Sequence, residues 1–147
     1  MTAFHEIAGG CHCGNITYKF FSPLPKSELP LRSCDCSFCT KQGACYTSHP
    51  KGRLLIQIKD QAQIKHYRFG TETAEAILCA SCGCFPFITA ELDGQTFAVL
   101  NANSIDDLQI DHAVIPPALH LVDFSVAERI RRWKNFWIGQ VEIETFL

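Results

Sequence analysis

Several features are scarce in this 147-residue chain, and each absence excludes a class of protein. The formal net charge is only −2, so the chain has no general electrostatic attraction for nucleic acid or for an anionic membrane surface. The longest uncharged run, residues 76–90, is too short to cross a bilayer and contains a proline. We therefore expect neither a nucleic-acid partner nor a membrane partner.

The N-terminal residues also lack the features of a secretory signal. His5 and Glu6 interrupt the first ten residues, which contain no apolar run of the required length. We therefore expect a cytoplasmic protein. Nine cysteines in a reducing compartment favour metal binding over disulfides, and their odd number agrees with this interpretation.

Length and patterning favour one mainly β domain over residues 1–147, since the chain is long enough to bury a substantial core. Asp93 and Gly94 form a strong hairpin signal between two apolar segments. Residues 74–78 fit a strand or a helical turn equally well. The segments predicted as strands are 16–20, 44–48, 54–58, 64–69, 85–90, 95–100 and a last one at 118–122.

A short amphipathic helix is predicted at the C-terminal end, over about residues 125–137. Ser125 and Glu128 have the spacing of a capping box at its start. One face of this helix would carry its apolar residues, which are Ile130, Trp133, Phe136 and Trp137.

The same helix carries the basic cluster Arg129, Arg131, Arg132 and Lys134. Because the other face is apolar, we expect this cluster to be solvated, with a phosphate-binding patch as the less favoured interpretation.

Seven of the nine cysteines fall into three short clusters. Cysteines two residues apart point to the same face of an extended backbone, and a Cys-x-x-Cys spacing is typical of zinc knuckles. Such clustering rarely results from core packing, so metal binding is favoured over buried inert thiols. The clusters are Cys11/Cys13, Cys34/Cys36/Cys39 and Cys79/Cys82.

The first and last clusters together supply four thiolates, which is the ligand set of a closed structural zinc site. Cys34, Cys36 and Cys39 then remain as a three-thiolate site that lacks one ligand. The candidates for its fourth position are water, a substrate thiolate, and the side chains of Cys45, Cys84 and a histidine such as His66.

Two other uses of these cysteines are less favoured. An iron–sulfur cluster takes the same ligands, but the spacings do not match those of ferredoxins. A thioredoxin-like redox role is disfavoured because no βαβ unit surrounds either Cys-x-x-Cys pair.

Three motifs, in this order, resemble the glutathione-dependent formaldehyde-activating enzyme family, which also includes centromere protein V domains. They are Gly9-Gly10-Cys11-His12-Cys13-Gly14, Cys34-x-Cys36-x-x-Cys39 followed by Gly43-Ala44, and Cys79-x-x-Cys82-Gly83. The resemblance covers about residues 9–122. One departure is Cys84, where relatives commonly have a small hydroxylic residue.

The resemblance implies an Mss4-like fold, also called a β-tent, in which zinc pins β-sheets together. It also implies two Zn²⁺ ions per chain. The structural zinc would be bound by Cys11, Cys13, Cys79 and Cys82, and the second, reactive zinc by Cys34, Cys36 and Cys39. Residue counting suggests the same partition.

The family's named reaction implies a zinc-dependent carbon–sulfur lyase that acts on glutathione–aldehyde adducts such as S-(hydroxymethyl)glutathione. Glutathione, or a similar small thiol, would be its partner. No catalytic residue beyond the reactive zinc site is indicated by the sequence. The alternative is a non-catalytic zinc module that binds a thiol ligand or a protein, because no clear acid or base accompanies the cysteines.

Overall fold

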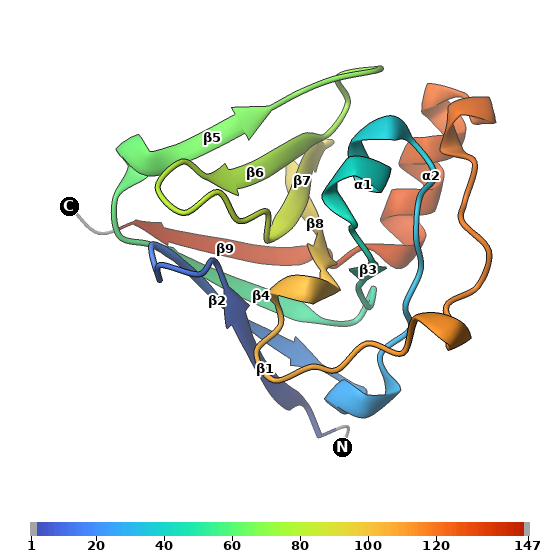
Figure 1. Cartoon of the computed structure of the whole chain (residues 1–147). Coiled ribbons are helices and arrows are strands. Elements are labelled where there is room, and N and C mark those ends of the chain that lie inside the picture. The colour runs from blue at the N-terminus through green and yellow to red at the C-terminus, as the bar shows by residue number, and fades with distance from the viewer. Residues whose placement is uncertain (1–2, 146–147) are drawn as a thin grey trace.

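The computed structural model describes residues 3–145, whose strands form two sheets (Figure 1). The four-stranded sheet has the order β1-β2-β4-β9 and the five-stranded sheet has the order β3-β8-β7-β6-β5. The prediction of a mainly β protein is confirmed. The strands of the first sheet are β1 (His5–Gly10), β2 (Ile16–Ser22), β4 (Arg53–Ile58) and β9 (Gln140–Thr145). Those of the second are β3 (Tyr46–Thr47), β5 (Ile64–Tyr67), β6 (Glu75–Cys79), β7 (Phe87–Leu92) and β8 (Gln95–Asn101).

The helices lie between or after these strands. They are α1 (Ser37–Gln42), α2 (Val126–Phe136) and the short 3-10 turns Lys26–Glu28, Gln61–Gln63, Ala102–Ser104, His112–Val114 and Leu121–Asp123. No helix within residues 3–145 is both long enough and apolar enough to cross a membrane.

The main core lies between the two sheets. The alternating residues Ile16, Tyr18 and Phe20 of β2 are buried, which confirms the predicted half-buried strand. The Tyr18 ring meets the Phe87 ring of the other sheet edge-on, with 6.3 Å between the ring centroids. Burial of each large apolar side chain contributes about 1.5–3 kcal/mol, so this layer holds the sheets together.

The turn at Asp93 and Gly94 joins β7 to β8, as predicted. Asp93 has a φ of 54° and Gly94 a φ of 78°, the left-handed conformation that two-residue hairpin turns require. Residues 74–78, for which the sequence favoured neither element, lie largely in β6.

The predicted last strand at 118–122 is wrong. Leu119 forms an isolated bridge with Cys34 and makes backbone hydrogen bonds to Ser33 and Asp35. Pairing stops there because the partner segment enters α1 at Ser37, and residues 121–123 form a 3-10 turn. The last strand of the described chain is instead β9, which pairs in parallel with β4.

The predicted C-terminal helix is present as α2. Ser125 Oγ accepts a hydrogen bond from Glu128 N, which is the N-cap bond of the predicted capping box, and donates one to Glu128 Oε1, each at 3.1 Å. Trp133 and Trp137 stack with their ring centroids 4.7 Å apart and are buried. Phe136, which was predicted on the same apolar face, is 46% exposed.

The two tryptophans belong to a second apolar cluster that joins α2 to the five-stranded sheet and to α1. Val99 of β8 and Cys39 of α1 are members of the same cluster. Figure 1 shows α1 and α2 at the same end of the molecule. This packing brings the C-terminal helix next to the central cysteine cluster.

Candidate metal centre

The structure brings the first and last cysteine clusters together, although 65 residues lie between Cys13 and Cys79 in the sequence. The sulfur atoms of Cys11, Cys13, Cys79 and Cys82 all lie within 4.8 Å of one another. Cys13 Sγ is 3.7 Å from Cys11 Sγ and 3.6 Å from Cys79 Sγ. Zinc–sulfur bonds of about 2.3 Å in a tetrahedron place sulfurs about 3.8 Å apart, so this set fits such an ion.

Local backbone geometry prepares these sulfurs to carry negative charge. The amide of Ile16 donates to Cys11 Sγ at 3.2 Å, and the amide of Cys82 donates to Cys79 Sγ at 3.5 Å. Gly83 has a φ of 81°, which lets the chain reverse directly after the second knuckle. Amide donors stabilise thiolates and hold them in position, as expected around a metal.

The central cluster forms a separate group, in which the sulfurs of Cys34, Cys36 and Cys39 also lie within 4.8 Å of one another. Cys36 is the N-cap of α1, and its sulfur accepts a hydrogen bond from Cys39 N at 3.4 Å. The amide of Cys36 in turn donates to Cys34 Sγ at 3.5 Å. One helical turn therefore returns Cys39 to the two extended cysteines, as the spacing predicts.

Tyr46, a residue of β3, completes the surroundings of Cys39. Its Oη lies 3.0 Å from Cys39 Sγ, and both residues are buried. Burial, with the Cys39 thiolate when that is charged, raises the pKa of Tyr46, so the phenol keeps its proton and can donate a hydrogen bond to a Cys39 thiolate. Sequence analysis missed Tyr46 because a tyrosine in a two-residue strand carries no distinguishing pattern.

Cys34 and Cys39 of the central group have unequal acidities. A hydrogen bond from Cys39 lowers the pKa of Cys34 to about 6, against the burial that opposes ionisation. The same contact with Cys34, followed by burial, raises the pKa of Cys39. Cys34 therefore ionises before the buried Cys39.

The proposed protein ligands for the fourth position lie elsewhere. No further His, Cys, Asp or Glu side chain joins the three-sulfur group within the described residues 3–145. Cys45 is buried in the main core, and His66 pairs with Glu75. Cys84 lies beside the four-thiol group, where its carbonyl accepts from Cys79 N at 2.9 Å.

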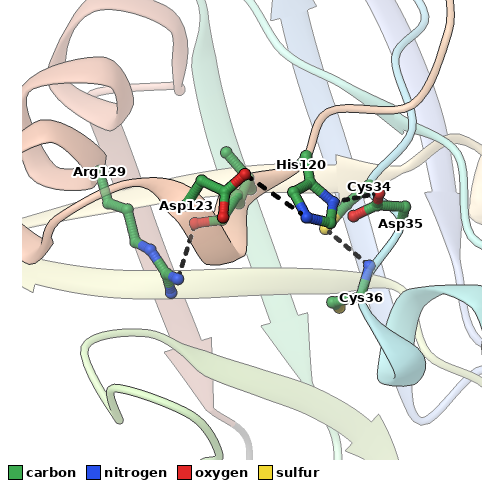
Figure 2. Close-up of polar contacts among 7 residues, drawn as sticks. Cys34, Asp35, Cys36, His120, Asp123 and Arg129 are labelled. Atoms are coloured by element: carbon green, nitrogen blue, oxygen red, sulfur yellow. Dashed lines mark hydrogen bonds and ion pairs between the residues drawn. The ribbon is translucent and has the colours of Figure 1, made fainter.

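His120 and Asp35 form a polar pair beside Cys34 (Figure 2). His120 Nδ1 lies 2.5 Å from Asp35 Oδ2, and His120 Nε2 lies 3.5 Å from Asp123 Oδ2. These two carboxylates, Asp35 first, raise the pKa of His120. Asp35 stands between Cys34 and Cys36 in the sequence, but nothing there marks it as an acid with a partner, because His120 lies 85 positions later.

A cavity of about 270 Å³ opens at the central group. All three of its cysteines line the cavity, as does Tyr46. Trp133 and Trp137 of α2 form another part of the wall. The four cysteines of the other group do not line it. The two thiol groups therefore differ in surroundings: one ties strands together, and the other faces a space with room for a small molecule.

These features define a β protein with two separate thiol groups suited to metal ions. The family model of the glutathione-dependent formaldehyde-activating enzyme matches residues 6–122, and the chain belongs to this family. The expected Mss4-like fold class is confirmed. A protein of Rhodobacter sphaeroides with a crystal structure is similar at 25% identity and a TM-score of 0.49, over 69% of this chain and 90% of that one.

Proposed function

We propose that the protein is a zinc-dependent carbon–sulfur lyase that acts on glutathione–aldehyde adducts such as S-(hydroxymethyl)glutathione. The observation that carries this proposal is the position of Cys34, Cys36 and Cys39 at a cavity, one ligand short of a tetrahedral set. A thiol ligand that enters the cavity can supply the missing sulfur. Membership of the family supports the same reaction class.

The metal assignment follows from the two thiol groups. Cys11, Cys13, Cys79 and Cys82 would hold a structural zinc ion, and Cys34, Cys36 and Cys39 would hold a second one. When bound by the three cysteines, zinc supplies Lewis acidity and lowers the pKa of a thiol.

In the cleavage direction, the carbon–sulfur bond of the adduct breaks and the carbonyl double bond of the aldehyde forms. The hydroxyl proton of the adduct is lost, and the sulfur leaves as glutathione thiolate or thiol. In the reverse direction the sulfur adds to the carbonyl carbon and the oxygen takes up a proton. No oxidant or reductant is needed in either direction.

The chain's own residues would prepare the site in two ways. Tyr46 would keep its proton on Oη and donate a hydrogen bond to the Cys39 thiolate, which would hold that sulfur in place. Trp133 and Trp137 make part of the wall apolar, which excludes water from the reacting sulfur.

The test is the rate of adduct formation and cleavage with purified, zinc-loaded protein, compared with a buffer blank. The uncatalysed addition is fast, so the blank is measured at every glutathione and aldehyde concentration. We expect an increase over the blank that Cys36→Ala abolishes. Cys45→Ala, which removes a thiol from neither group, should keep it. Wild-type rates equal to the blank would contradict the proposal.

A further inference from the structure

Helix α2 lies after residue 122, where the family match ends, and contributes a charged wall to the cavity. Arg129 and Arg132 of this helix line the cavity together with Arg32. All three are partly buried, whereas Arg131 is exposed and does not line the cavity. The expectation that the basic cluster is only a solvated helix face is therefore wrong for two of its members.

Neighbouring atoms hold the three arginine side chains in place. Arg129 Nη2 donates to the Leu121 carbonyl at 2.7 Å, and the Arg132 guanidinium carbon lies 4.9 Å from the Phe136 ring centroid. Arg32 donates to Ser48 Oγ, which itself donates to the Phe136 carbonyl at 2.6 Å. Ser48 thus links the Arg32 guanidinium to the C-terminal end of α2.

No Asp or Glu side chain of the described residues forms an ion pair with the arginines of this wall, Arg32, Arg129 and Arg132. Asp35 and Asp123, which lie close by, face His120 instead (Figure 2). Burial and the neighbouring Arg132 charge lower the pKa of Arg32 to about 10. Arg129 Nε is buried and has no hydrogen-bond partner among the residues that the structure describes.

Partly buried guanidinium groups without acidic partners are unfavourable unless an anion compensates for them. A carboxylate is the matching group, because the planar fork of arginine donates two parallel hydrogen bonds to its oxygens. The Cys34, Cys36 and Cys39 thiols line the same cavity. A ligand that satisfies both the arginines and the thiol site has a carboxylate and a sulfur, in a cavity of about 270 Å³.

We propose that Arg32, Arg129 and Arg132 form a carboxylate-binding subsite, by which this protein selects thiols and thiol adducts that carry a carboxylate. The inference rests on the proposed function for the sulfur end of the ligand. The carboxylate end depends on the arginines alone. Arg129 and Arg132 of this subsite lie on α2, beyond the part of the chain that the family model matches, whereas Arg32 lies within that part.

The test separates anion binding from sulfur chemistry by using S-methylglutathione, whose sulfur is capped and forms no aldehyde adduct. Its dissociation constant from the zinc-loaded protein is measured by calorimetry and compared with that of its dimethyl ester, which has no carboxylate charge. We expect the acid to bind at least about tenfold more tightly than the ester, since a lost hydrogen bond to a charged group weakens binding by about that factor or more.

Arg132→Gln should remove most of this preference, whereas Arg131→Gln, which changes the net charge equally on the same helix, should retain it. Arg129→Gln serves as a second variant, with the circular dichroism of both variants confirming that they fold. Equal binding of acid and ester to the wild type, or equal loss in Arg131→Gln and Arg132→Gln, would overturn the proposal. A wild-type preference for the acid without any catalysed adduct formation would contradict the lyase and leave the subsite standing.

Discussion

Replacement of Tyr46 by phenylalanine tests whether the central thiols form a metal site whose ligand Cys39 is supported by a hydrogen bond from Tyr46. The substitution removes only the hydroxyl that lies 3.0 Å from Cys39 Sγ. The ring, whose centroid lies 6.3 Å from that of Phe85, can keep its packing. The sulfur of Cys39 would lose its phenolic donor in a position where Cys39 is only 5% exposed.

A hydrogen bond to a charged group contributes about 1.5–3 kcal/mol, and loss of a group that supports a metal ligand typically costs about 10–100-fold in metal affinity. We therefore expect Tyr46→Phe to weaken zinc binding at the central group by about that factor. The four-thiol group should keep its affinity, because within residues 3–145 the Tyr46 hydroxyl makes no hydrogen bond to any of its sulfurs.

The assay is competition for zinc with a chromogenic chelator, which resolves the two sites by the chelator concentration that empties each. Tyr18→Phe is the matched control. It removes a hydroxyl that lies 2.7 Å from Ser104 Oγ, away from both thiol groups. This control should lower the free energy of unfolding by about 1 kcal/mol and leave zinc release unchanged. Release from Tyr46→Phe at wild-type chelator concentrations would refute the reasoning.

Three further results are expected. Prolonged chelation, or Cys79→Ser, should lower the thermal unfolding midpoint far more than Cys36→Ser does. The reason is that a metal ion bound by the four-thiol group would link the end of β1 to β6. Equal shifts of the midpoint in calorimetry would contradict this expectation. Asp35→Asn should lower the pKa of His120, as followed by NMR, because the Asp35 carboxylate favours the protonated imidazole; an unchanged titration would exclude that cause. Ser125→Ala should cost about 0.5–2 kcal/mol in denaturant unfolding through loss of the α2 cap, whereas no change would mean that the cap is dispensable.

The cysteine groups could be predicted from the sequence because short spacings fix the relative placement of their members. Cys36 and Cys39 meet through one helical turn, and Cys79 and Cys82 through one knuckle. Completing the four-thiol group required only that two such pairs share one ion. Local chemistry therefore determines most of both sets.

The surroundings of the central group depend on contacts between distant segments. Tyr46, His120 and Arg32 carry no pattern that marks them, and each acquires its neighbours only when strands and α2 pack together. The pairing of β9 with β4 also depends on distant segments. Val141 and Ile143 alternate with charged residues, but the parallel partner β4 lies more than 80 positions earlier in the sequence.

At residues 118–122 the sequence predicts a strand that the structure does not contain. Their apolar pattern predicts a strand, but the segment beside them offers only the hydrogen bonds around Leu119 before it becomes α1. A strand needs a partner of matching length, which the pattern of one segment does not reveal.

Metal content per chain tests the central claim most directly. Elemental analysis of the purified protein, with protein concentration from amino-acid analysis, should give two zinc ions per chain for the wild type. Cys36→Ser should give one, and Cys45→Ala should give two. A wild-type value of one, or a value of two in Cys36→Ser, would contradict the assignment of a second metal to Cys34, Cys36 and Cys39.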